Sequence, residues 1–347
     1  MAGPGGVNIA KTVRYVKGIV PDSMGDSMTR ARKAGISLAL GGGGARGFAH
    51  LGVFQVLTRR GIPVGSIVGT SSGAIAGAGL ALGYDIAEMV ERAREFAASP
   101  LANDPRVKAM IRDGAGETRA GLGDRFGRLV CQGRLLKSLV LEDSVLGQEF
   151  FRAMVEFFAP DVLIEAMPLP FAAVATDSRS GQTVILDRGP LREALSASCA
   201  VPGVAPLVRH QGRALMDGGV CSLVPTLEAR QMGHARLLAV SVDRALETSP
   251  AEPRQALEIF LRAGDIQATV LNELTLRQAD LVLRPPVGHL HWMDFVKAEQ
   301  IVEAGRQETE IRLAAIERLA ANRLGDRLGR AWRAARVTLG RRTAETF

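Results

Sequence analysis

Aromatic residues make up only 5% of this sequence, cysteines are few, and long hydrophobic runs are lacking. The three cysteines, Cys131, Cys199 and Cys221, are scattered and odd in number, a pattern that favours a reducing compartment over a disulfide framework or a metal site. No run approaches the roughly 18 apolar residues of a membrane span. Residues 1–20 contain no apolar core of a secretory signal. We therefore expect a cytoplasmic protein.

Charge is concentrated at the two ends of the chain. Residues 1–33 carry six basic and two acidic side chains, and residues 310–347 carry nine arginines against four acidic side chains. Such basic ends indicate attraction to an anionic membrane surface, or they serve only to keep the protein soluble. They lack interleaved aromatic residues and a recognisable nucleic-acid-binding module, so we expect no nucleic-acid partner.

One stretch organises the 347 residues, Gly69-Thr70-Ser71-Ser72-Gly73. It follows a β-branched run at 66–68 and precedes an apolar run of small residues at 74–82, which predicts a strand, a sharp turn and a buried helix. This is the G-x-S-x-G pattern of a nucleophile elbow, in which flanking glycines leave the serine hydroxyl accessible. The alternative is a buried strand–turn–helix whose glycines serve only packing.

A glycine-rich loop, 41–47, joins a predicted strand at 36–40 to a helix that ends near residue 59. It lacks the Gly-Lys-Ser/Thr of a P-loop. It fits a dinucleotide-binding pattern literally, but no acidic residue between Phe48 and Tyr84 is present to hold a ribose. The remaining interpretation is an oxyanion hole of backbone N–H groups facing Ser71. Adjacent parallel strands would bring loop and serine to the same sheet edge.

Along the rest of the chain, residues 100–134 have weak periodicity and are a candidate lid or an ordinary loop. Phe150, Phe151, Phe157 and Phe158 are interpreted as core. A turn is expected at Gln211-Gly212. Further predicted strands are 171–175, 183–186, 215–217, 237–242 and 281–283, and further predicted helices are 85–98, 135–158, 191–199, 254–276 and 293–319.

A serine nucleophile needs a base. The α/β-hydrolase order would be Ser71, then Asp187 or Asp217, then His289 or His291; the other histidines are His50, His210 and His234. None of the five has distinctive turn residues around it. Asp217, at a predicted strand end before Gly218 and Gly219, is the better candidate for a base that acts without histidine.

Taken together, three ordered motifs resemble the patatin-like phospholipase family, in particular its bacterial branch related to neuropathy target esterase. They are Gly42-Gly43-Gly44-Ala45-Arg46-Gly47, Gly69-Thr70-Ser71-Ser72-Gly73 and Asp217-Gly218-Gly219. The blocks 175–181 and 196–203 also resemble family segments. The resemblance runs from about residue 36 to 242, with a weaker echo to about 315. One departure is Val220-Cys221-Ser222-Leu223, where the family often has asparagine.

The resemblance implies an α/β, three-layer patatin-like fold, with a mostly parallel central sheet flanked by helices and a Ser–Asp dyad at the C-terminal edge of the strands. It implies a serine lipid acyl hydrolase of the phospholipase A or lysophospholipase type, without metal or cofactor. Ser71 would form the acyl intermediate, Asp217 would be the base, and Gly42, Gly43 and Gly44 would form the oxyanion hole. Supporting roles fall to Arg46, Gly47, Gly69, Gly73, Gly218 and Gly219, with Arg46 given first a structural role. The alternative is a catalytically weak patatin-fold adaptor that binds lipid or protein.

The expected organisation is a basic N-terminal extension (1–33), a catalytic core (34–243), a C-terminal helical part of the same domain (244–320) and a basic amphipathic tail (321–347). The tail pattern begins inside the helical part. Apolar residues recur there at spacings of three or four, at Leu313, Ile316, Ala320, Leu324, Leu328 and Trp332. Such a helix could lie on an anionic membrane, as a peripheral contact, or pack on its own domain.

Overall fold

The computed structural model describes residues 35–107, 144–243 and 256–321. At its centre lies an eight-stranded sheet in the order β5-β6-β3-β2-β1-β7-β8, with β4 paired to β3. Five neighbouring strands are parallel: β1 (Ile36–Leu40), β2 (Val64–Thr70), β3 (Phe171–Asp177), β7 (Leu237–Val240) and β8 (Leu281–Leu283). The antiparallel strands are β4 (Thr183–Leu186), β5 (Val208–His210) and β6 (Arg213–Asp217). The predicted α/β class with a mostly parallel sheet is confirmed.

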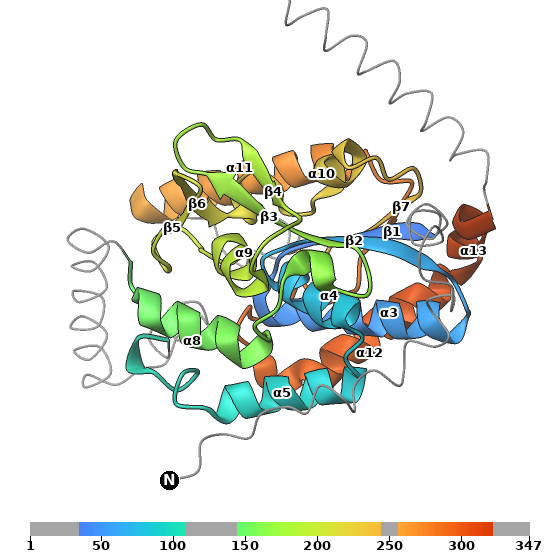
Figure 1. Ribbon diagram of the computed structural model, residues 1–347, viewed down its shortest axis with the longest axis horizontal. Helices are drawn as coiled ribbons and strands as arrows, with labels where there is room; N and C mark the ends of the chain where they lie inside the picture. The colour runs from blue at the N-terminus through green and yellow to red at the C-terminus, as the bar shows by residue number, and fades with distance from the viewer. Residues whose placement is uncertain (1–34, 108–143, 244–255, 322–347) are drawn as a thin grey trace, which may run out of the picture.

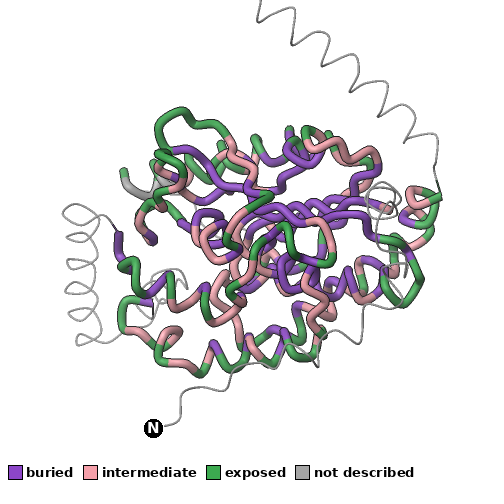
Figure 2. The backbone as a smooth tube through the Cα atoms, in the orientation of Figure 1, coloured by how far each residue is buried: buried purple, intermediate pink, exposed green. Residues whose placement is uncertain are grey.

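Helices cover both faces of the sheet (Figure 1). One layer contains α3 (Ala49–Arg59), α4 (Ser72–Leu82), α9 (Leu191–Ser198) and α12 (Ala298–Ile311), with α5 (Ile86–Ala98) and α8 (Gln148–Phe158) outside it. The other contains α10 (Thr226–Gln231) and α11 (Ala256–Leu276). The strands lie in the buried interior (Figure 2). Along β1, Leu38 and Leu40 face the core beneath α4, whereas Ala39 faces the opposite core, as strand periodicity requires.

The element boundaries follow the local sequence signals. The predicted helix at 85–98 begins one residue later, because Asp85 is its N-cap and accepts a hydrogen bond from the backbone N–H of Ala87 at 2.8 Å. The predicted turn is the β5–β6 hairpin, where Gln211 and Gly212 both have positive φ, 47° and 78°. The predicted helix at 293–319 is divided into η6 (Phe295–Lys297), α12 and α13 (Leu313–Ala321). The expected extension 1–33, most of the candidate lid, Cys131, helix residues 135–143 and the tail beyond 321 lie outside the described residues.

The first part of the amphipathic pattern packs on its own domain. Ile316 of α13 is fully buried in the core beneath β1, and Leu313 and Ala320 pack against the same core. Of the two alternatives for this helix, the described part thus agrees with intramolecular packing.

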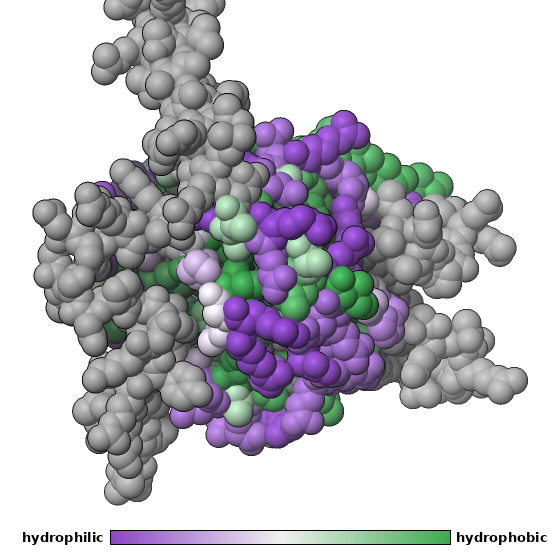
Figure 3. Space-filling view, turned by 90° about the vertical axis from the view of Figure 1, so that its right-hand side faces the viewer, coloured by the Kyte–Doolittle hydropathy of each residue, from purple (hydrophilic) through white to green (hydrophobic). Residues whose placement is uncertain are grey.

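The α11 helix has an exposed hydrophobic face. Figure 3 shows hydrophobic side chains at the upper right of the described surface, at the height of α11 in Figure 1. Among the described residues, no helix has the length and apolar character required to cross a bilayer. The exposed hydrophobic residues of α11 are Ile259, Phe260, Ile266, Val270, Leu271 and Leu274.

The α3 and α12 helices cross in close contact at two glycines, Gly52 and Gly305. A Cβ atom on Gly305 of α12 would collide with the carbonyl oxygen of Ala49, and one on Gly52 of α3 would collide with the carbonyl oxygen of Val302. Backbone therefore lies directly against backbone at this crossing. Because α3 follows the glycine-rich loop, the crossing also fixes the helix that carries this loop.

This close crossing predicts opposite effects for two helical glycines. Gly305→Ala should lower the free energy of unfolding by about 1–3 kcal/mol, because its methyl group has no space. Gly264→Ala, in exposed α11 with nothing near its Cβ position, should raise it by up to about 1 kcal/mol. Urea unfolding of both variants measures the difference, and an unaltered stability of Gly305→Ala would contradict the packing described here.

Candidate active site

Ser71 lies in a strained turn between β2 and α4. Its backbone angles are φ 53° and ψ −125°, a region that residues with side chains rarely occupy. The flanking glycines are required by space: a Cβ on Gly69 would lie 2.5 Å from the carbonyl oxygen of Gly73, and one on Gly73 would collide with the end of β1 at Leu40. The turn has the form of a nucleophile elbow.

A buried hydroxyl holds this turn in place. The backbone N–H of Ser71 donates to Ser198 Oγ at 2.9 Å, and Ser198 Oγ donates to the carbonyl oxygen of Val174 at 2.7 Å. Ser198 is fully buried at the end of α9. The sequence placed Ser198 in a family-like block but gave no sign that its side chain would support the elbow.

Asp217 lies at the end of β6, which runs antiparallel to β2 and β3. Thr70, at the end of β2, is paired with Val174, and the next residue of β3, Ala175, is paired with Asp217 at the end of antiparallel β6. The Asp217 carboxylate therefore lies beside the turn that contains Ser71. It accepts a hydrogen bond at 2.7 Å from the backbone N–H of Gly219, and it lies close enough to the Ser71 hydroxyl for that hydroxyl to lower its pKa. The structure thus brings together the two residues singled out as nucleophile and base.

Burial raises the pKa of both titratable side chains next to Ser71, Asp217 and Cys199. It raises the pKa of Asp217 from 3.8 to about 6, against the opposing hydrogen bonds from Gly219 and Ser71. Near neutral pH the carboxylate is mostly ionised and more basic than an ordinary aspartate. Burial and then the charge of Asp217 raise the pKa of the Cys199 thiol, against an opposing effect of Ser71, so the thiol stays protonated. Cys199 and Cys221 are both free cysteines.

The glycine-rich loop differs in one respect from expectation. The backbone N–H of Gly42 donates to the carbonyl oxygen of Leu223 at 3.0 Å and so is occupied within the protein. Gly42 instead allows the loop to pass close to Ser71, because a Cβ on this residue would lie 3.1 Å from Ser71 Cβ. The available donors are the N–H groups of Gly43 and Gly44, at the start of the 3-10 helix η2 (Gly44–Phe48), where a first turn leaves donors without intrahelical partners.

Two side chains fix the peptide planes of this loop. Arg46 Nε donates to the carbonyl oxygen of Gly43 at 3.1 Å, and His50 Nε2 donates to that of Gly41 at 2.8 Å. In a trans peptide the C=O and N–H groups point in opposite directions, so Arg46 also sets the direction of the Gly44 N–H. This hydrogen bond agrees with the structural role expected first for Arg46, which stays a prediction.

Complete burial lowers the pKa of His50 to about 4, which keeps its ring neutral in this role. Of the remaining motif glycines, Gly47 and Gly218 lie close to other atoms. A Cβ on Gly47 would lie 2.7 Å from Ser72 Oγ, and one on Gly218 would collide with the carbonyl oxygen of Val174.

The segment that departs from the family pattern supports the site through its backbone. Thr70 Oγ1 donates to the carbonyl oxygen of Ser222 at 2.9 Å, and the carbonyl oxygen of Leu223 accepts the Gly42 N–H. Ser222 Oγ in turn donates to the buried Glu228 at 2.7 Å. An asparagine after Asp-Gly-Gly is therefore not needed to connect this segment with the elbow and the loop.

Four of the five histidines have hydrogen-bond partners away from Ser71. His50 holds Gly41, His210 lies 2.7 Å from Glu193, and His234 bonds Ser66. His291 Nδ1 accepts the backbone N–H of Met293, and His289 is exposed. None of the hydrogen bonds found for Ser71 among the described residues involves a histidine.

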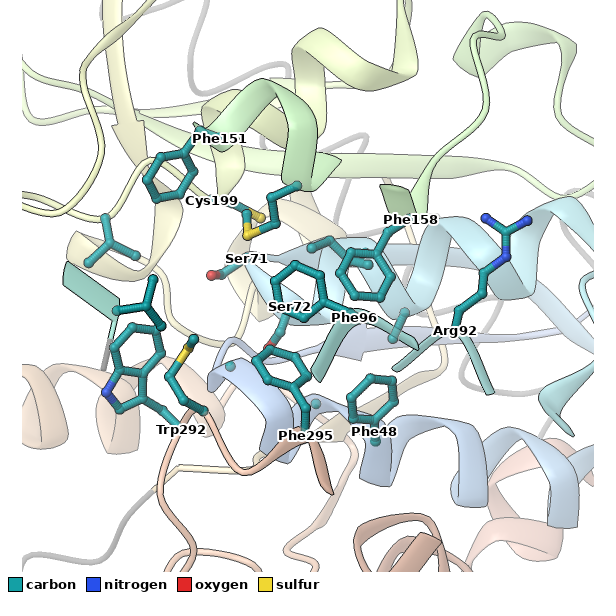
Figure 4. Close-up of a pocket in the computed structure, with 18 of the residues that line it drawn as sticks. Phe48, Ser71, Ser72, Arg92, Phe96, Phe151, Phe158, Cys199, Trp292 and Phe295 are labelled. Carbon is teal, nitrogen blue, oxygen red and sulfur yellow. The ribbon is translucent and has the colours of Figure 1, made fainter. Parts of the chain in front are cut away.

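A cavity of about 150 Å³ opens beside Ser71 (Figure 4). Half of the sixteen aromatic residues of the chain line it, so the few aromatics are concentrated here. Phe150, Phe151 and Phe158, interpreted from sequence as core, also contribute cavity wall. Because such walls exclude water, an apolar chain is the ligand that fits. The eight aromatic lining residues are Phe48, Tyr84, Phe96, Phe150, Phe151, Phe158, Trp292 and Phe295.

Comparison with known proteins agrees with these features. The family model for patatin-like phospholipases matches residues 38–230, more than half of the chain and nearly all of the site. The chain belongs to the patatin-like phospholipase family and has the patatin fold.

Among named relatives, an NTE family protein of Mycobacterium tuberculosis is 29% identical over 317 residues, which cover 85% of this chain and 49% of that protein. Lysophospholipase NTE1 of Eremothecium gossypii is 26% identical over 296 residues, 78% of this chain and 18% of that protein. The chain spans about half the length of the first of these relatives. Among solved structures, VipD from Legionella pneumophila is similar with a TM-score of 0.41 and 15% identity, covering 81% of this chain and 67% of that chain.

The buried carboxylate generates a stability prediction. The pKa of Asp217 is higher in the folded state than its ordinary value of 3.8, so the neutral carboxyl favours folding, and this contribution is lost as pH rises through about 6. Asp217→Asn, which keeps an acceptor for Gly219, should therefore raise the free energy of unfolding at about pH 7.5, by up to about 3 kcal/mol.

The gain should shrink toward pH 5. Urea unfolding at both pH values tests this, with exposed Asp187→Asn as the matched control that leaves stability unchanged. A destabilised Asp217→Asn at pH 7.5 would show that the ionised carboxylate is stabilised by the fold.

Proposed function

We propose that this chain is a serine carboxylester hydrolase that acts on lipid acyl esters, with Ser71 as nucleophile and Asp217 as base. The observation that carries the proposal is the position of the buried Asp217 carboxylate beside the Ser71 hydroxyl at a strained elbow, where the strand pairing brings the two residues together. A serine needs such a base, and a carboxylate with a pKa near 6 is well matched to neutral pH.

The proposed reaction has two halves. Ser71 Oγ attacks the ester carbonyl while Asp217 accepts the hydroxyl proton, and the tetrahedral oxyanion is held by the N–H groups of Gly43 and Gly44 and by the positive N-terminal end of α4. Asp217 then returns the proton to the leaving alcohol, which leaves an acyl-Ser71 ester. Water, deprotonated by Asp217, attacks this ester; the proton passes back to Ser71 and the fatty acid is released.

The substrate class is inferred from the cavity. Its walls are almost entirely apolar and reach Ser71, which suits a hydrocarbon acyl chain. The family and the name of the Eremothecium relative, a lysophospholipase, support a phospholipid or lysophospholipid, met at a membrane surface by peripheral contact.

Labelling with a fluorophosphonate probe tests the nucleophile and the base together. Wild-type protein should be labelled, Ser71→Ala should not, and Asp217→Asn should react at least about 100-fold more slowly, the usual range for loss of a general base. Ser72→Ala and Asp187→Asn are matched controls that should be labelled. Rapid labelling of Asp217→Asn, combined with its loss in His289→Ala or His291→Ala, would replace the dyad by a histidine mechanism. Folded wild type that stays unlabelled with and without lipid vesicles would favour the adaptor alternative.

The elevated pKa of Asp217 predicts the pH dependence of the reaction. Only the ionised carboxylate accepts a proton, so the labelling rate of wild type should rise with pH, reach half its maximum near pH 6 and then level off. Burial raises this pKa, so a midpoint near 4 would indicate that the carboxylate is solvated in the reacting state. Rates measured between about pH 4.5 and 8 decide between the two.

A further inference from the structure

The cavity beside Ser71 has a single charged lining residue among those that the structure describes, Arg92 of α5. Its guanidinium carbon lies 5.8 Å from the ring centroid of Tyr84, which also lines the cavity. In Figure 4, Arg92 lies beyond Phe96 and Phe158, on the opposite side of Ser71 from Trp292. One end of an otherwise apolar cavity is therefore polar and positively charged.

Within the part of the chain that the structure describes, the guanidinium of Arg92 has few hydrogen-bond partners. It has five N–H donors, and Nη1 donates to the carbonyl oxygen of Phe157 at 3.0 Å. Burial raises the pKa of the neighbouring Tyr84. The positive charge of Arg92 lowers this pKa, and the negative charge of Glu88 raises it. No ion pair among the described residues includes Arg92, whereas its neighbour Arg94 pairs with Glu91 and Glu299. A half-buried cation without a carboxylate partner is suited to bind an anion.

The length of α4 separates this end from the nucleophile. Ser71 immediately precedes α4, and Tyr84 follows it by two residues. A helix of 11 residues is about 16 Å long. The lining between the two ends, such as Ile75, Phe96 and Phe158, is hydrocarbon. An extended hydrocarbon chain advances about 1.25 Å per bond, because its C–C bonds of about 1.5 Å meet at tetrahedral angles. A ligand that reaches along α4 from Ser71 to the end with Tyr84 and Arg92 is therefore a hydrocarbon chain of about twelve or thirteen carbons.

We propose that Arg92 and Tyr84 form an anion-binding site for the far end of the acyl chain. The ligand class is an ester of an α,ω-dicarboxylic acid, whose ester group lies at Ser71 and whose free ω-carboxylate accepts hydrogen bonds from Arg92. This rests on the proposed function only for the position of the ester at Ser71. The phosphate of a glycerophospholipid is joined to its ester carbonyl by too few bonds to span α4, so it does not reach this site.

Direct binding tests the site without requiring catalysis. In the Ser71→Ala background, which cannot hydrolyse the ligands through the proposed nucleophile, calorimetry compares methyl dodecanoate with the monomethyl ester of dodecanedioic acid. The ω-carboxylate ligand should bind at least about tenfold more tightly. Adding Arg92→Gln should abolish this preference, and adding Arg94→Gln, on the same helix but outside the cavity lining, should preserve it.

Each other outcome overturns the assignment. Equal affinity for the two esters means that the chain end is not recognised, and a preference that survives Arg92→Gln places the carboxylate elsewhere. If dodecanoyl lysophosphatidic acid gains its affinity through Arg92 and the ω-carboxylate ester does not, the site holds a headgroup phosphate. Because binding is measured without turnover, a confirmed preference together with an unreactive Ser71 would separate this site from the proposed hydrolase activity.

Discussion

The left-handed backbone of Ser71 is the constraint on which the rest of this structure depends. A side-chain-bearing residue with φ 53° persists only where its surroundings hold it. Here the Ser198 hydroxyl accepts a hydrogen bond from the Ser71 N–H. The end of β1 lies so close to residue 73 that this residue must be glycine. The loop after β1, the end of β6 and the start of α4 are then arranged around one hydroxyl group.

Much of this arrangement could be predicted from sequence because it is local or follows from parallel pairing. Glycine-containing turns after short apolar runs indicated β1 and β2. Since parallel strands place their carboxyl ends at one edge of a sheet, the loop at Gly43 and the elbow at Ser71 were expected to lie close together. The hairpin before Asp217 could also be predicted, since Gln211-Gly212 is a turn between two short strands. These signals depend on spacing within about ten residues, which a single sequence displays directly.

The features that sequence did not show are those fixed by contacts between distant segments. The Gly42 N–H is occupied by a carbonyl 181 positions later, at Leu223, so its expected donor role fails. Ser198 and His50 act through single hydrogen bonds to backbone groups, and nothing in their neighbouring residues distinguishes them from ordinary buried polar residues. The phenylalanines of α8 were interpreted as core because the wall of an apolar cavity and a hydrophobic core have the same composition.

The two residues of the proposed dyad follow strands in different parts of the sheet. Ser71 follows a central parallel strand that is enclosed by neighbours on both sides, whereas Asp217 arrives on β6, one arm of a hairpin at the margin. A marginal hairpin can be shortened, shifted or replaced over evolutionary time without dismantling the parallel centre. A change in this hairpin would therefore move the carboxylate, whereas the position of the Ser71 hydroxyl is fixed by the parallel centre of the sheet.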